Sequence, residues 1–401
     1  MILNMITQGG GSAPSASKSR KDINFFDYDG TIVESYTAQE WASVSSLPAN
    51  PSHDGLVAQG WNYTLAEINT EVSAQGKCDI GQMYVTESGN TEIDIHIADI
   101  ARNNPYLGIA VNGTAVIDWG DGSATDTVTG TSLYTQIRTQ HTYSAAGYYT
   151  IKIIVSSGSI SFYGTYPLLS NNINSNNSRV FANMVQAIRI GANANIGSTA
   201  AFIDCYSLSS ITIPNSVTRL CSNMFQNCYS LLSITIPSSV IYINSTNAFY
   251  SCYSLSSISL PRSITTVETY TFQNCYSLSS VTIPSSVTSI KGNAFNSCYS
   301  LSSIILPRSI TSVETYMFQT CGSLSSITIP SSVTSIKNNA FLNCYGMAEY
   351  HFESTTPPTL ANINAFNNMP SDCIIYVPSA SLSAYQSANN WSTYASKMIG
   401  E

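Results

Sequence analysis

The chain has 401 residues, a net charge of −8 and a charged fraction of only 9%, far below the roughly 25% of ordinary soluble proteins. The charges are spread thinly and form no basic patch, which argues against nucleic acid as a partner. No apolar run approaches the ~18 residues of a membrane span, which argues against membrane insertion.

Residues 1–22 begin with a short apolar stretch that glycines interrupt, and the basic residues follow it. A secretory signal has the opposite order, with positive charge before an apolar stretch of about 7–15 residues. We therefore expect a flexible or anchoring arm here, and no signal peptide.

Residues 23–97 predict a small α+β module. Two β-runs flank Asp29-Gly30 and predict a hairpin. Thr-x-x-Glu capping boxes at Thr37 and Thr64 open two short amphipathic helices. Residues 81–97 predict a second hairpin, with its turn at 88–90 and three alternating isoleucines on one face.

The stretch "DYDGT" at residues 27–31 resembles the start of a haloacid-dehalogenase phosphatase site. That resemblance implies Asp27 as nucleophile, Asp29 as general acid/base, and a magnesium ion. The phosphate-binding lysine of such a site has no counterpart, because no lysine lies between Lys77 and Lys152. We therefore interpret Asp27 as a turn residue, expect no catalysis and no cofactor, and keep the phosphatase as a minor alternative.

Residues 98–157 contain "WGDGS" (119–123) and "HTYSAAGYY" (141–149). These motifs resemble a PKD-type immunoglobulin-like β-sandwich, a spacer or adhesive module of extracellular proteins. Three carboxylates near the turn suit either calcium or the closing of turns onto backbone N–H groups, and we favour the turns and no metal: Asp118, Asp121 and Asp126. His141 is interpreted as structural, and residues 158–181 as a linker.

From residue 205 the chain repeats every 23 or 24 residues, as in "CYSLSSITIP", which predicts a solenoid whose units bury apolar positions against their neighbours. In the first unit, Cys205, Leu208, Ile211 and Ile213 point inward, and Pro214 ends the strand because it has no N–H to donate. The strands should stack as a parallel sheet.

The repeat cysteines form a column of seven. An odd column cannot pair completely, free Cys behaves as a small buried hydrophobe, and no CxxC or Cys/His cluster suggests a metal. We predict free, buried thiols at these positions: Cys205, Cys228, Cys252, Cys275, Cys298, Cys321 and Cys344.

The repeat closely resembles the BspA-like leucine-rich repeat over residues 182–370, and residues 371–401 resemble the strand and short helix that cap such arrays. The fold class is then mixed and mainly β: a small α+β N-terminal module, a PKD-like β-sandwich, and a leucine-rich-repeat solenoid with a C-terminal cap.

Beside the cysteine column runs a row of tyrosines that Gly322 breaks before Tyr345, and outward strand positions add hydroxyls. The rings either stack on one another and cover the solenoid edge, or form with the hydroxyls a platform for sugars. The candidate ligand-binding residues are Tyr206, Tyr229, Tyr253, Tyr276, Tyr299, Thr212, Thr235, Thr282 and Thr328.

The segment from residue 25 to residue 86 also resembles a module that precedes PKD-like and leucine-rich-repeat regions in proteins of gut bacteria, prophages and phages. The resemblance implies a virion-surface protein attached to other virion proteins through its N-terminal part. Its repeats would recognise bacterial-envelope or mucosal glycan or protein. A bacterial cell-surface or extracellular adhesin is the alternative.

Overall fold

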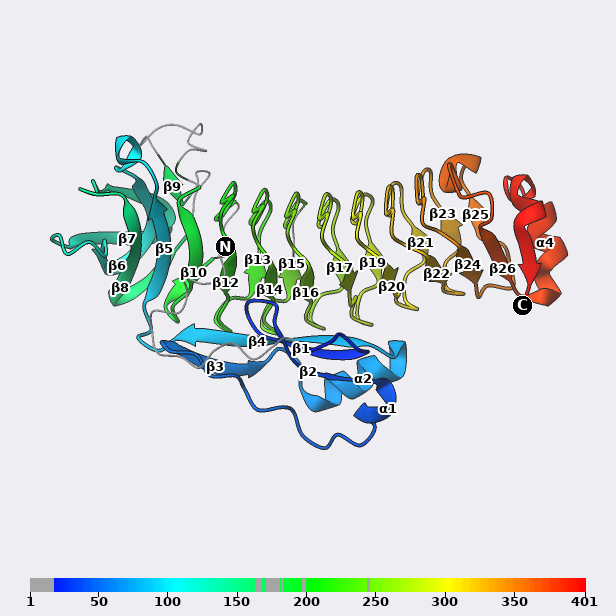
Figure 1. Ribbon diagram of the computed structural model, residues 1–401, viewed down its shortest axis with the longest axis horizontal. Helices are drawn as coiled ribbons and strands as arrows, with labels where there is room; N and C mark the ends of the chain where they lie inside the picture. The colour runs from blue at the N-terminus through cyan, green and yellow to red at the C-terminus, as the bar shows by residue number, and fades with distance from the viewer. Residues whose placement is uncertain (1–17, 163–167, 171–180, 182, 197–199, 244–245) are drawn as a thin grey trace.

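The computed structural model describes residues 18–162, 168–170, 181, 183–196, 200–243 and 246–401. Figure 1 shows a long solenoid with a bent β-sheet at one end, a helical cap at the other, and a small module along one side. The protein is mainly β, and the solenoid has about nine turns. Most of the expected 1–22 arm lies outside the described residues.

The N-terminal module, residues 23–86, is a four-stranded sheet in the order β2-β1-β4-β3. The predicted hairpin joins β1 and β2, and Gly30 N donates to the Asp27 carbonyl at 3.0 Å. Both capping boxes are formed, at Thr37 and at Thr64. The elements are β1 (Ile23–Phe26), β2 (Ile32–Tyr36), α1 (Ala38–Trp41), β3 (Leu56–Trp61), α2 (Leu65–Gln75) and β4 (Cys78–Thr86).

The second predicted hairpin is wrong. Strand β5 (Thr91–Ile97) does not pair with β4 but lies in another sheet, between β8 (Gly147–Ser161) and β10 (Val185–Arg189). Its alternating isoleucines fit any sheet with one buried face. Between two partners β5 satisfies both of its edges, and Ile93, Ile95 and Ile97 become fully buried.

The bent sheet runs in the order β12-β10-β5-β8-β6-β7, so its hydrogen bonds continue into the first solenoid strand, β12 (Ser210–Thr212). β8 extends into the predicted 158–181 linker, and the described residues there pack against the sheet; the rest of that linker lies outside the described residues. The remaining elements are η1 (Ile100–Arg102), β6 (Tyr106–Asp118), β7 (Asp126–Gln140), β9 (Leu169–Ser170) and β11 (Ala194–Asn195).

Arg189 joins two neighbouring strands of the bent sheet, β10 and β5. Its guanidinium donates two hydrogen bonds to Asp94 on β5, each 2.7 Å long, and a third of 3.0 Å to Glu92. This forked geometry fixes direction as well as distance. One hydrophobic core runs from Ile93 to Met398, so the bent sheet caps the first turn of the solenoid.

Each solenoid turn contributes one strand to each of two ladders of short parallel strands. The first ladder continues from β12 with β14 (Ser233–Thr235), β16 (Ser257–Ser259), β18 (Ser280–Val281), β20 (Ser303–Ile304), β22 (Ser326–Ile329) and β24 (Glu349–Phe352). The second ladder contains β13 (Arg219–Leu220), β15 (Tyr242–Ile243), β17 (Thr266–Val267), β19 (Ser289–Ile290), β21 (Ser312–Val313), β23 (Ser335–Ile336) and β25 (Thr359–Leu360).

Aromatic rings stack along the solenoid core, one from each turn. Their centroids are 5.4–5.7 Å apart over Phe202, Phe225, Phe249, Phe272, Phe295, Phe318, Phe341 and Phe366. Each fully buried phenylalanine removes a large apolar area from water only because its neighbours cover both faces. In a single turn those ring faces would be exposed to solvent, which explains why the turns are stable only as an array.

The cysteine column is free and buried, as predicted. From Cys228 to Cys344, each thiol donates to a phenylalanine carbonyl 26 or 27 positions earlier at 3.1–3.3 Å. Burial raises the pKa of Cys205 and of Cys344 to about 12. The thiols therefore serve as packing groups with a weak hydrogen bond.

The residue before each column cysteine has a left-handed backbone, with φ between 60° and 63°. Asn fills this position in three turns, which fits its tolerance of that conformation. The position is held by Asp204, Asn227, Ser251, Asn274, Ser297, Thr320 and Asn343.

The C-terminal residues close the open end of the core. Strands β26 (Ile374–Val377) and β27 (Met398–Gly400) extend the first ladder, and Trp391 packs against Phe366, the last ring of the core stack. Among the described residues no helix has the length and apolarity to cross a bilayer. The remaining elements are η2 (Ile363–Phe366), η3 (Ser379–Ser381), α4 (Leu382–Ser387) and η4 (Trp391–Lys397).

Candidate functional site

The N-terminal module covers the outward face of the first ladder, with β4 crossing β12, β14 and β16 (Figure 1). Two of the outward hydroxyls donate to the module: Ser233 Oγ donates to the Tyr28 carbonyl at 3.0 Å, and Ser259 Oγ donates to the Asp79 carbonyl at 2.7 Å. Gly81 allows the close approach, because a Cβ there would lie 2.1 Å from Thr235 Oγ1.

This docking corrects the expected hydroxyl surface. Thr212 and Thr235 are only 4% and 8% exposed, because the module covers them. Thr282 is half-buried and donates to Asp79 Oδ2 at 2.9 Å. Thr328 on β22 is exposed, beyond the covered turns.

Two buried carboxylates hold the module in place. Glu71 on α2 is fully buried, lies 2.7 Å from Arg262 Nε, and accepts hydrogen bonds from the backbone and hydroxyl of Ser285 at 3.0 Å each. Asp79, only 4% exposed, pairs with Arg20 at 2.5 Å and joins the module to the repeats by accepting from Thr282 Oγ1. Sequence reasoning missed both, although Glu71 interrupts the apolar face of a helix in a chain that has few charges.

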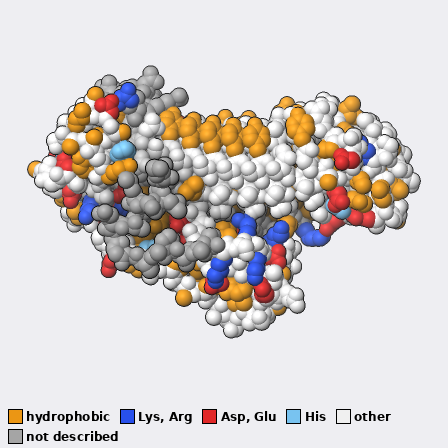
Figure 2. All heavy atoms as spheres, in the orientation of Figure 1, with side chains coloured by type: hydrophobic (Ala, Val, Ile, Leu, Met, Phe, Trp, Pro, Cys, Tyr) orange, Lys and Arg blue, Asp and Glu red, His pale blue; other side chains and the backbone are white. Residues whose placement is uncertain are grey.

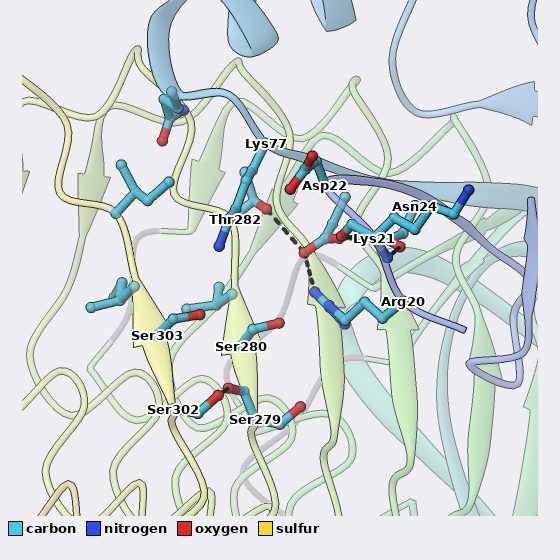
Figure 3. Close-up of a pocket in the computed structure, with 15 residues that line it drawn as sticks. Arg20, Lys21, Asp22, Asn24, Lys77, Ser279, Ser280, Thr282, Ser302 and Ser303 are labelled. Atoms are coloured by element: carbon cyan, nitrogen blue, oxygen red, sulfur yellow. Dashed lines mark hydrogen bonds and ion pairs between the residues drawn. The ribbon is translucent and has the colours of Figure 1, made fainter. Parts of the chain in front are cut away.

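A groove of about 330 Å³ lies where the module ends over β18 and β20 (Figure 3). We call it the junction groove. Its walls carry Arg20, Lys21, Asp22 and Lys77, and its floor carries the serines of two turns. Figure 2 shows Lys and Arg side chains gathered where the module meets the solenoid.

Most charged side chains of the junction groove already have an ion-pair or hydrogen-bond partner in the protein. Arg20 pairs with Asp79, Lys21 pairs with Glu40, and Asp22 accepts from Ala38 N at 3.0 Å. Among the described residues that line this groove, the Lys77 ammonium and the Ser280 and Ser303 hydroxyls have no hydrogen-bond or ion-pair partner. The groove can accept one small polar group, but its main contacts hold the module to the repeats.

The tyrosines form a second surface, the tyrosine edge, defined as Tyr206, Tyr229, Tyr253, Tyr276 and Tyr299. Their rings stack in one series with centroids 4.5–4.8 Å apart and interplanar angles of 2–20°. The rings thus stack on one another, which is one of the two arrangements that the sequence left open. Figure 2 shows a row of hydrophobic side chains along one edge of the solenoid, away from the N-terminal module.

The stacking decides which parts of these rings a ligand can reach. Inside the series both faces of a ring are covered by its neighbours, so the ring edges and phenol groups face the solvent. Tyr299, the last ring before Gly322, is 45% exposed, and Tyr345 beyond the break is 61% exposed. The pKa of Tyr276, a ring inside the stack, is raised mainly by burial and to a smaller extent by the neighbouring tyrosines.

The Asp27 carboxylate is enclosed. Asp27 is 5% exposed, one oxygen accepts from the Tyr84 hydroxyl at 2.9 Å, and the other lies 2.7 Å from His53 Nε2. Asp29 caps its own turn by accepting from Thr31 N at 2.8 Å. Asp27 is thus a turn residue, and both of its carboxylate oxygens have side-chain partners within the module.

The carboxylates of the bent sheet also have protein partners. Asp118 and Asp121 accept from backbone N–H groups two residues later, as expected, whereas Asp126 accepts from Trp119 Nε1 at 2.8 Å. His141 stacks on Trp119 and lies 2.8 Å from Asp121, a structural role. In the described ranges no group of three such ligands could hold a metal.

Comparison with known proteins identifies the repeats. The family model for the BspA-type leucine-rich-repeat region matches residues 156–247 and 245–371 in six copies, which is more than half of the chain. No curated protein matches significantly.

Solved structures resemble only parts of the chain. A leucine-rich repeat protein from Bacteroides ovatus is 24% identical over 48% of this chain and 62% of its own, with a TM-score of 0.35. A leucine-rich cell surface protein from Faecalibacterium prausnitzii is 28% identical over 46% of this chain and 57% of its own, with a TM-score of 0.32. The chain thus spans less than two thirds of either protein.

Proposed function

The chain belongs to the BspA-type leucine-rich-repeat family, and from this premise we propose that it is a non-enzymatic binding protein that recognises surface glycans through its tyrosine edge. The observation that carries the proposal is the single stack of five tyrosine rings, whose last ring, Tyr299, is 45% exposed. A sugar offers apolar C–H groups and a rim of hydroxyls, which match ring edges and phenols.

Repetition gives this surface its strength. Each of the five turns from Tyr206 to Tyr299 presents a tyrosine followed by a serine, about 4.8 Å from the next, so a linear glycan would meet several equivalent contacts. Contacts that are weak singly gain by being linked. Thr328 lies on the outward face of the first ladder, which the module covers in earlier turns, so it is no part of the tyrosine edge; Thr212 and Thr235 lie under the module.

We assign the protein to a virion surface, with its N-terminal part bound to other virion proteins, and keep a bacterial cell-surface adhesin as the alternative. The resemblance of residues 25–86 to a module of phage and prophage proteins supports the first. The family, whose members are typical of cell surfaces, fits both. In this proposal the bent sheet corresponds to the PKD-like module, and it would act as a rigid spacer at the start of the repeats.

The first experiment compares two triple variants in binding to bacterial cells and to immobilised glycans. Replacing Tyr253, Tyr276 and Tyr299 with Ser should weaken binding at least tenfold and leave the circular dichroism spectrum unchanged. The control replaces three exposed tyrosines elsewhere, Tyr148, Tyr242 and Tyr270, and should bind normally. Undiminished binding by a folded tyrosine-edge variant would refute the proposal.

A second experiment tests the location. Immunogold electron microscopy with an antibody to the repeats should label phage particles released from the host. Label confined to the bacterial envelope would replace the virion assignment by the adhesin. Either result leaves the binding proposal standing on its own test.

A further inference from the structure

The tyrosine edge has one missing ring. Gly322 occupies the tyrosine position of its turn, and a Cβ built there would have no heavy atom within 4 Å. The backbone register continues through this turn, since Ser323 N donates to the Tyr299 carbonyl at 3.1 Å and Cys344 Sγ to the Phe318 carbonyl at 3.1 Å. By this register Tyr299 and Tyr345 belong to the turns on either side of an open position.

The width of this opening follows from the repeat spacing. Successive rings of the stack are 4.5–4.8 Å apart, so Tyr299 and Tyr345, two turns apart, are separated by about 9–10 Å. That spacing admits one ring, stacked on each neighbour at the distance the tyrosines themselves adopt. Figure 2 shows the row of hydrophobic side chains interrupted once along this edge.

We propose that the opening between Tyr299 and Tyr345, here called the Gly322 slot, binds one pyranose ring of a neutral glycan. The slot is where the tyrosine edge exposes ring faces rather than ring edges. Both faces of the inserted sugar would pack on an aromatic face, which roughly doubles the area that one sugar buries against a flat platform.

The surroundings of the slot favour a neutral sugar. No charged residue occurs in the three segments that form it, residues 295–303, 318–326 and 341–348. Ser300 and Ser323 are exposed at its rim and can donate to or accept from sugar hydroxyls. An acidic sugar would find no cation there, and an aromatic side chain from a protein would leave the rim hydroxyls without a matching group.

The inference rests on the proposed function, because it selects one position of the tyrosine edge as the main contact. The decisive variant is Gly322→Tyr, which restores the "CYSLSSITIP" sequence of its sister units and fills the slot. We expect it to fold with equal or higher stability and to bind cells at least tenfold more weakly. Gly322→Ala, the matched control, adds a methyl group in open space and should bind like the natural protein.

A direct titration uses cellohexaose, mannohexaose and chitohexaose as probes, with the tyrosine resonances of the full chain observed by NMR. We expect at least one hexasaccharide to shift Tyr299 and Tyr345 together, and Gly322→Tyr to abolish the shift. No shift with any of the three would overturn the proposal. A shift with N-acetyl-tyrosinamide alone would also overturn it, since the occupant would then be a protein side chain.

The cell-binding results separate this inference from the proposed function. Full binding by Gly322→Tyr together with lost binding by the tyrosine-edge variant would overturn the slot and leave the tyrosine edge as the glycan surface. Full binding by both variants would overturn both. Lost binding by both supports the slot within the tyrosine edge.

Discussion

Arg262 Nε lies 2.7 Å from the fully buried Glu71 carboxylate and so joins the third full repeat to the N-terminal module. Arg308 occupies the same position two turns later, in the same "LPRSIT" sequence, but pairs with Glu353 and has a side chain that is 70% exposed. The same repeat position thus holds an arginine that pairs with a buried carboxylate in one turn and an arginine that forms a surface ion pair in another.

This pair predicts very different costs for the same substitution. Arg262→Ala leaves a buried carboxylate without its cation and should lower the free energy of unfolding by about 3 kcal/mol. Arg308→Ala, the control, should cost less than about 1 kcal/mol. Urea unfolding and limited proteolysis of the module measure both; equal costs would mean that Glu71 does not anchor the module.

The left-handed position before each cysteine predicts a stabilising change. Thr320 is β-branched and has φ = 60°, where Asn is tolerated far better. Thr320→Asn should therefore raise the free energy of unfolding by roughly 1 kcal/mol. Asn274→Thr, the reverse change in a sister turn, should lower it by a similar amount. The prediction is wrong if both changes shift the thermal midpoint in one direction.

The cysteine column predicts a sharp contrast in thiol reactivity. All ten cysteines are free, nine are buried, and only Cys221 is partly exposed. Burial raises the pKa of the column thiols, so they are not thiolates at neutral pH. Iodoacetamide should label at most Cys221 in the folded protein and all ten in urea, as counted by mass spectrometry. Stoichiometric disulfides in unreduced protein would contradict the structure.

His53 predicts a loss of stability at high pH. Its hydrogen bond to Asp27 raises the pKa of His53, although burial opposes the shift. A raised pKa in the folded state stabilises the protein below the unfolded value of about 6.5, and this contribution disappears as the pH rises through the folded value. The thermal midpoint of the natural protein should fall toward that of His53→Asn between pH 6 and pH 9. A constant difference across that range would exclude the coupling.

Asp121 predicts the opposite pH dependence. Burial disfavours its charge, but hydrogen bonds from Ser123 and His141 outweigh burial and lower the pKa of Asp121 to about 2. A lowered pKa stabilises the fold above the unfolded value of about 3.9, and this contribution is lost as the pH falls toward 2. Asp121→Asn should therefore be less stable than the natural protein at pH 6 and nearly equal to it at pH 2. A difference that persists at pH 2 would assign the effect to packing.

The repeats could be predicted from sequence because their information is local. Cys205, Leu208 and Ile211 recur at fixed spacing, and each contacts its counterparts one turn away, so the period alone identifies the solenoid. The hairpin at Asp29-Gly30 and the two capping boxes are also encoded within a few residues. These predictions are confirmed.

The docking of the module could not be predicted in this way. Thr282 and Asp79 are 203 positions apart, and a threonine that bonds to a carboxylate has no sequence pattern different from one that faces water. Thr212 and Thr235 were expected on the surface for that reason. The predicted pairing of β5 was wrong for a similar reason, because the alternation of its residues specifies a buried face but not which strand pairs with it.

The N-terminal module docks on only the first turns of the solenoid, and this leaves the length of the solenoid free to change. The module's hydrogen bonds to the repeats come from turns up to Ser285, so the turns beyond it can be duplicated or deleted by recombination without disturbing that contact. Every added turn of 23 residues would lengthen the rod by about 4.8 Å. The length of the rod can thus change while the contact between the module and the repeats stays the same.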